Sequence, residues 1–172
     1  MTEKTKKGRK PSRERMPVTG TALGAIEGAI DTLTELRDEF QEIVDNATEG
    51  LQQTERHQTR EATVDALSFV DDGLPDLPEE AGDVACSWVE NQHPKASRAA
   101  RCANAVSALE AARDAIQEWL DEKNEKLDED EAEDKPDEDG LEEQIAQAEE
   151  AVNTLEEWIS NAEGTEWPGM FG

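Results

Sequence analysis

Aromatic residues are scarce in this chain of 172 residues, where they make up 4%, and apolar residues of all kinds make up only 35%. Both fractions are low for a compact globular protein. Long apolar runs are missing too, and no stretch approaches the roughly 18 residues that a membrane-spanning helix needs. The basic N-terminus lacks the apolar segment of a signal peptide. We therefore expect neither a membrane span nor secretion.

Residues that build catalytic and metal centres are also few, with two cysteines and two histidines. His57 and His93 stand apart from the cysteines at spacings that match no zinc motif. Glu90 and His93 have the Glu-x-x-His spacing of di-iron bundles, but such a site needs two of these pairs. Phosphate-binding loops and nucleophile elbows are absent from the sequence. We predict no catalytic residues, no cofactor, no metal site and no enzymatic activity.

The two cysteines, Cys86 and Cys102, lie in Ala-rich segments with helical spacing, which indicates buried thiols in a reducing compartment. They are equally distant in sequence from Pro94. An antiparallel helical hairpin that turns at Pro94 would place them at the same height. Two interpretations stay open: a pair of small core residues, or a candidate redox pair that forms a disulfide under oxidant.

Positive charge is the scarcer sign, because 17 Lys and Arg residues face 43 Asp and Glu residues and the net charge is −26. The imbalance is uneven: the first 15 residues hold seven basic residues and two acidic ones, so nearly all the acidic excess lies after them. An acidic body of this kind repels nucleic-acid backbones and attracts basic surfaces.

The apolar residues that are present recur at helical spacing. Segment 99–120 places them on one face, with Ser97 as a candidate N-cap and Pro94 blocking an upstream continuation. We interpret this segment as the central helix of a bundle. Its apolar face consists of Cys102, Val106, Leu109, Ile116, Trp119 and Leu120.

Heptad spacing marks two further helices, at residues 19–51 and 141–162, and a short helix is predicted from Pro78 or Glu79 to about Asn91. The seam of the first helix has one row at Leu23, Ile30, Val44 and Leu51 and a second row at Ile26, Leu33, Phe40 and Ala47. The seam of the last helix is unbroken: Leu141, Ile145, Ala148, Val152, Leu155, Ile159 and Ala162.

These patterns predict an all-α fold without a sheet, an antiparallel helical bundle with coiled-coil-like helices. We expect residues 1–17 to form a disordered basic arm and residues 18–122 to form the bundle core. Residues 123–140 are predicted to be an acidic flexible linker, partly helical before Pro136 and flexible after it, which does not match a calcium loop. Residues 141–163 are the heptad helix, and residues 164–172 are an apolar tail that either straps onto the bundle or anchors a partner.

The predicted function is that of a helical structural or protein–protein interaction protein, compatible with an accessory protein of a phage or mobile element. It would be cytoplasmic, or virion-associated if a phage encodes it, and its heptad helices are also suited to self-association. The candidate partner-binding residues are Lys4, Lys6, Lys7, Arg9, Lys10, Arg13, Arg15, Trp167, Met170 and Phe171.

Two other functions remain as alternatives. The acidic body suits an inhibitor or DNA mimic that occupies the basic cleft of a nucleic-acid-binding protein. The basic arm suits a protein that contacts nucleic acid through the arm alone.

Overall fold

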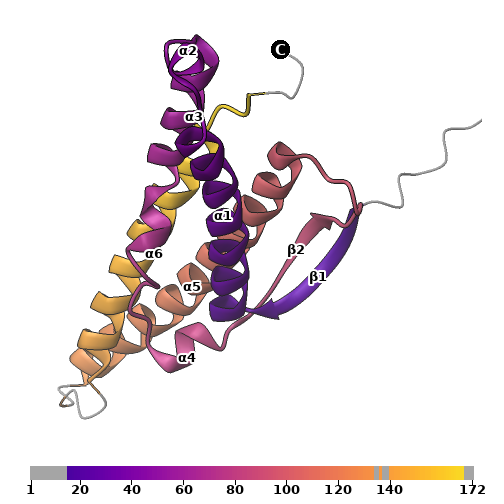
Figure 1. Cartoon of the computed structure of the whole chain (residues 1–172). Helices are drawn as coiled ribbons and strands as arrows, with labels where there is room; N and C mark the ends of the chain where they lie inside the picture. The colour runs from indigo at the N-terminus through magenta and orange to yellow at the C-terminus, as the bar shows by residue number, and fades with distance from the viewer. Residues whose placement is uncertain (1–14, 134–135, 137–139, 169–172) are drawn as a thin grey trace, which may run out of the picture.

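The computed structural model describes residues 15–133, 136 and 140–168, and most of them are helical (Figure 1). The prediction of a mainly helical fold is confirmed, whereas the prediction that no sheet is present is wrong. Two strands, β1 (Arg15–Thr21) and β2 (Ala85–Asn91), pair antiparallel. The helical elements are α1 (Ala22–Asp45), α2 (Glu49–Gln52), α3 (Glu55–Ala66), the 3-10 turn η1 (Ser68–Asp71), α4 (Glu79–Gly82), α5 (Arg98–Ala132) and α6 (Leu141–Glu163).

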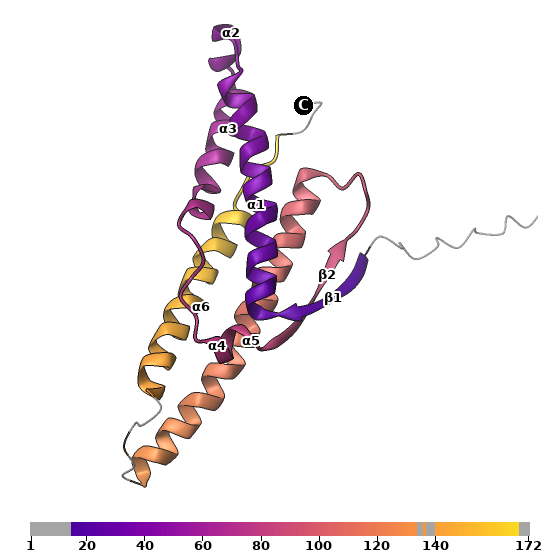
Figure 2. The ribbon, with the colours of Figure 1, turned by 60° about the horizontal axis from the view of Figure 1, so that its bottom comes forward.

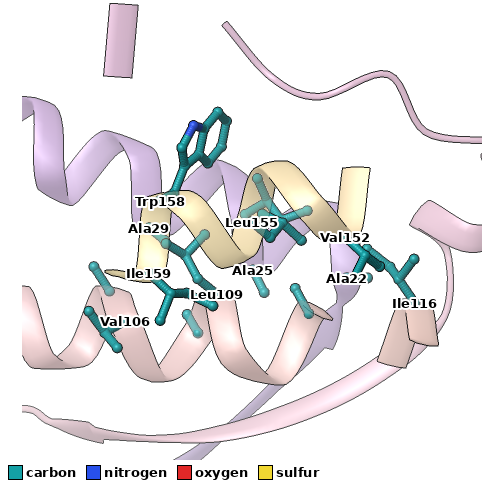
Figure 3. Close-up of a cluster of buried hydrophobic side chains, with 14 of the residues drawn as sticks. Ala22, Ala25, Ala29, Val106, Leu109, Ile116, Val152, Leu155, Trp158 and Ile159 are labelled. Atoms are coloured by element: carbon teal, nitrogen blue, oxygen red, sulfur yellow. The ribbon is translucent and has the colours of Figure 1, made fainter. Parts of the chain in front are cut away.

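Helix α5 is the central element, since α1, α6 and β2 all pack against it (Figures 1 and 2). Its start is the predicted one: the Ser97 hydroxyl accepts a hydrogen bond from the Ala100 backbone N–H at 3.1 Å. All six apolar residues predicted for its buried face are buried. Figure 3 shows the resulting core, in which side chains of α5 such as Leu109 meet Ala29 of α1 and Leu155 of α6.

The unbroken seam of α6 is buried at all seven predicted positions, and it packs along α5. Trp158 adds to this face and stacks on Phe69, with ring centroids 5.4 Å apart. The predicted acidic linker begins as a helix, because residues 123–132 continue α5. Lys123 helps to fasten this extension, since its ammonium group lies 2.6 Å from the Glu80 carboxylate. Residues 134–135 and 137–139 lie outside the described part.

Helix α1 is shorter than predicted, and one of its two seam rows is displaced. Ile26, Leu33 and Phe40 are buried as expected, but Leu23, Ile30 and Val44 are only partly buried. The buried stripe still keeps heptad spacing. Its second row lies one residue before the predicted one, at Ala22, Ala29 and Leu36, and Ala25 is buried beside it.

The sheet corrects two boundaries. Residues 85–91 form a strand and not the second half of a short helix, and residues 15–17 belong to β1 and not to a disordered arm. Residues 1–14 lie outside the described part. Alternate residues of β2, Cys86 and Trp88 among them, face the helices and are half-buried. Gly20 leaves room for the indole, because a Cβ atom there would lie 3.3 Å from Trp88 Cη2.

Removing one buried side chain of the α6 seam tests this packing. The Leu155→Ala substitution should lower the free energy of unfolding by about 2–5 kcal/mol, since it deletes a fully buried side chain and leaves a cavity. The exposed neighbour Glu157→Ala is the control and should change it by no more than about 0.5 kcal/mol. Denaturant unfolding measures both, and equal effects would show that α6 does not contribute to the core.

Candidate functional site

Pairs of glutamates repeat along the exposed side of α6. Each pair directly follows a buried position of the seam, at Leu141, Ala148 and Leu155. Because a helix rises 1.5 Å per residue, successive pairs are about 10.5 Å apart along the axis. We call these residues the α6 acidic rows: Glu142, Glu143, Glu149, Glu150, Glu156 and Glu157, all of them exposed.

Among the described residues, the four carboxylates of the last two pairs, from Glu149 to Glu157, form no ion pair with a basic side chain. Arg113 of α5 is a basic residue whose charge acts on the rows. Its hydrogen bond to Asp114 raises its pKa and the negative charge of Glu156 adds to this, but its ion pair is with Asp114 at 2.6 Å. These four carboxylates of α6, all exposed, therefore face solvent and any partner that approaches them.

The last turns of α5 are also acidic. Figure 2 shows that α6 begins close to the place where α5 ends, so the two helices form one hairpin. The extension of α5 has mostly acidic exposed side chains. They include Asp121, Glu122, Glu125, Asp128, Glu129 and Glu131.

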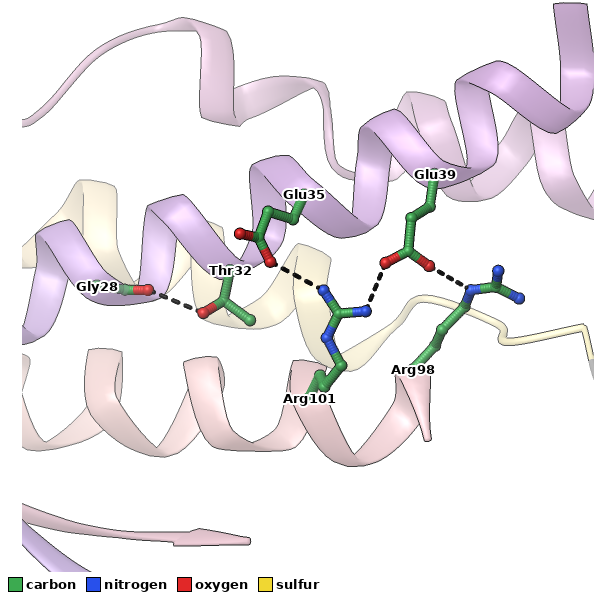
Figure 4. Close-up of polar contacts among 6 residues, drawn as sticks. All are labelled: Gly28, Thr32, Glu35, Glu39, Arg98 and Arg101. Carbon is green, nitrogen blue, oxygen red and sulfur yellow. Dashed lines mark hydrogen bonds and ion pairs between the residues drawn. The ribbon is translucent and has the colours of Figure 1, made fainter. Parts of the chain in front are cut away.

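A second charged group, which is electrically balanced, joins α1 to the start of α5 (Figure 4). Glu39 accepts hydrogen bonds from Arg98 Nε at 2.8 Å and from the Arg101 guanidinium, which also binds Glu35 at 3.0 Å. Burial by itself would raise the pKa of Glu39, but the hydrogen bonds from Arg101 and Arg98 outweigh it and the pKa is lowered. We call these four residues the Arg–Glu cluster.

A pocket of about 210 Å³ lies beside this cluster, between α1, α5 and β2. Its floor consists of small residues, and its walls include Trp88 and Glu90 of β2. The indole Nε1–H of Trp88 donates a hydrogen bond of 2.7 Å to Glu90 Oε1. The residues of the floor are Ala25, Gly28, Ala29, Ala105 and Ala108.

Only two of the ten candidate partner-binding residues fall in the described part. Arg15 is exposed on β1. Trp167 is half-buried and packs on Phe40, with ring centroids 5.7 Å apart. The neighbouring carbonyl of Glu166 accepts a hydrogen bond from the buried Thr63 hydroxyl at 2.8 Å, which fastens this part of the tail to α3. The remaining eight lie outside the described residues: Lys4, Lys6, Lys7, Arg9, Lys10, Arg13, Met170 and Phe171.

The structure does not bring Cys86 and Cys102 together. The prediction assumed two helices, but a strand rises about 3.3 Å per residue, so Cys86 lies roughly 16 Å along β2 from Asn91. Asn91 is the residue that meets α5 near Cys102, because its N–H binds the Asn104 side chain at 2.8 Å. Cys102 instead faces α6, where its Sγ lies 3.6 Å from the carbonyl oxygen of Ala162. Both thiols are free.

The histidines take structural positions. His57 is buried in α3, and its Nε2 lies 3.3 Å from the Glu61 carboxylate. His93 accepts a hydrogen bond from the Lys95 backbone N–H in the turn before α5. Within residues 15–133, 136 and 140–168, no cluster of three or more His, Cys, Asp or Glu side chains is arranged to hold a metal ion. No described helix has the length and apolar character needed to cross a membrane.

The α6 acidic rows were missed as a site by sequence reasoning, although the sequence does contain their signal. The segments LEEQIAQ, AEEAVNT and LEEWISN repeat a glutamate pair at the same heptad positions. Attention to the apolar seam alone overlooks this second periodicity. Comparisons with known protein families, curated proteins and solved structures find no match for this chain.

The Arg–Glu cluster predicts a dependence of stability on pH. A carboxylate with a lowered pKa stabilises the folded state above its unfolded pKa of about 4.5, and this contribution disappears as the pH falls through the folded pKa. At pH 7 the free energy of unfolding of the wild type should exceed that of Glu39→Gln by about 1 kcal/mol. The difference is modest because the ion pairs are partly exposed. The difference should close below pH 4.5. Unfolding midpoints between pH 7 and 3 measure it, with the exposed Glu42→Gln as control; a difference independent of pH would contradict the cluster's role.

The two thiols should react at different rates. Burial raises the pKa of Cys102 to about 11, with a further contribution from the negative charge of Glu163, whereas Cys86 is only half-buried. Cys86 should therefore be alkylated first, as peptide mass spectrometry over time would show. An intramolecular Cys86–Cys102 disulfide formed in the folded protein under mild oxidant would refute the placement of β2.

Proposed function

We propose that this chain is a non-enzymatic protein–protein interaction protein whose α6 acidic rows bind a basic surface of a partner. The observation that supports this proposal is the repeat of exposed glutamate pairs on a helix whose opposite side is buried. Solubility alone needs scattered charge, and it does not need one sign aligned in rows.

The rows are well suited to binding because the helix that carries them is held in place. Its seam, including Val152 and Leu155, is buried against α5, so the backbone does not need to become ordered when a partner binds. Only the glutamate side chains lose freedom, which keeps the entropic cost of association low. Unbalanced charge also accelerates encounter with a partner of opposite sign.

The spacing of the pairs indicates how a partner would engage them. At physiological ionic strength the Debye length is about 8 Å, which is shorter than the roughly 10.5 Å between successive pairs. Each pair therefore acts mainly on the basic groups directly opposite it. A partner with lysines or arginines at a matching repeat gains several local ion pairs, whereas one with a diffuse positive charge gains less.

A DNA mimic is the second candidate, and the same spacing favours it. Three phosphate steps along one DNA strand span about 10.2 Å, close to one heptad of α6. The density of charge is lower, however, because α6 presents two carboxylates where a DNA strand presents three phosphates. This difference places the mimic behind the general interaction protein. A role as an accessory protein of a phage or mobile element stays a prediction.

Neutralising the α6 acidic rows tests the proposal. A partner captured from the native source and identified by mass spectrometry should bind wild type with an affinity that falls as salt is raised. The quadruple substitution of Glu149, Glu150, Glu156 and Glu157 by Gln should weaken this binding at least about tenfold, because it removes charge and leaves the side chains' shape. Isothermal titration calorimetry measures the affinities.

The matched control neutralises four exposed carboxylates of α1: Glu27, Asp31, Glu42 and Asp45. It makes the same change in net charge and should leave affinity within about threefold of wild type. An equal loss of affinity in both variants would show that the partner responds only to net charge. No loss of affinity in the α6 variant would refute the proposal. Competition by duplex DNA for the partner, together with loss in the α6 variant, would identify the DNA mimic.

A further inference from the structure

The pocket between α1, α5 and β2 has an unbalanced charge. Two members of the Arg–Glu cluster, Glu35 and Arg101, line the pocket, and they form an ion pair of zero formal charge. Glu90 then adds one negative charge on the opposite wall. It is half-buried, and no basic side chain among the described residues forms an ion pair with it. The pocket therefore lacks one positive charge.

Glu90 is also held in position for an incoming group. Its Oε1 accepts the indole N–H of Trp88 at 2.7 Å, which fixes the carboxylate and leaves its second oxygen without a described partner. The Trp88 indole forms part of the same wall. An aromatic ring beside a carboxylate is a common environment for a cationic side chain, since the ring offers apolar contact and its face attracts positive charge.

The size of the pocket fits a side chain and not a larger ligand. A cavity of about 150 Å³ is enough for benzene, and pockets for drug-sized ligands start at about 300 Å³. The value here, about 210 Å³, lies between them. The space exists because the floor carries only alanines and a glycine; a Cβ atom added at Gly28 would meet no atom within 4 Å.

We infer that this pocket receives an arginine side chain of the basic partner. The guanidinium would pair with the free oxygen of Glu90, and its aliphatic stem would lie along the alanines of the floor. This inference rests on the proposed function, because it adds one specific anchor to the acidic surface. The pocket differs from the α6 acidic rows in position and in chemistry. It binds one arginine side chain, whereas the rows attract several basic groups at once.

The probe is N-acetyl-arginine methylamide, compared with its citrulline analogue, which has the same shape without the charge. Binding is followed by the cross-peak of the Trp88 indole N–H in a 1H–15N correlation spectrum. The Trp88→Phe variant assigns this cross-peak among those of the four tryptophans. The arginine probe should shift this signal and saturate at millimolar concentration, and the citrulline probe should not. Equal shifts with both probes, or no shift with either, would overturn the inference.

The decisive variant is Glu90→Gln, which keeps an acceptor for the Trp88 indole and removes the charge. It should weaken binding of the arginine probe about tenfold or more. The control Glu118→Gln changes an exposed carboxylate of α5 outside the pocket and should have no effect. A similar loss in both variants would indicate general attraction to an acidic protein and would refute the pocket.

The two proposals fail separately. If the α6 quadruple variant loses the partner but the probe never shifts Trp88, the acidic rows stand and the arginine pocket falls. If the probe binds and depends on Glu90 while the α6 variant keeps the partner, the pocket stands and the proposed role of the rows falls.

Discussion

The burial of α5 on three sides is the constraint on which the rest of the structure depends. With few aromatic residues in the chain, the core relies on close contact between small and aliphatic side chains. Alanines of α5 such as Ala108 and Ala112 are almost fully buried, which brings α1, α6 and β2 close to its axis. Each small side chain buries little apolar area, but close packing increases the number of van der Waals contacts and so stabilises the core.

This constraint also decides where the charge lies. Since α5 and the inner sides of α1 and α6 are occupied by apolar contacts, the carboxylates are confined to the outer sides of the helices. The exceptions occur where α1 meets the start of α5, and there the Arg–Glu cluster balances its own charge. The same packing leaves a gap beside β2, because the strand crosses helices whose facing residues are alanine and glycine.

Much of the helical architecture was predictable because its signal is local. The unbroken seam of α6 and the capped face of α5 each repeat over many residues, and both were buried as expected. The strand β2 was missed because Trp88 and Val89 also fit a helical face, and its pairing partner lies some 70 residues earlier, around Val18. No local pattern reports such a contact. The pocket was equally unpredictable, since it exists only once β2 is a strand.

The most direct measurement of the central claim is carboxylate footprinting of the protein alone and in complex with its captured partner. A carbodiimide-activated amine labels exposed carboxylates, and mass spectrometry locates the label. If the α6 acidic rows are the binding surface, Glu149, Glu150, Glu156 and Glu157 should lose labelling in the complex while Glu27 and Asp31 of α1 keep theirs. Unchanged labelling of α6 together with protection elsewhere would contradict the account.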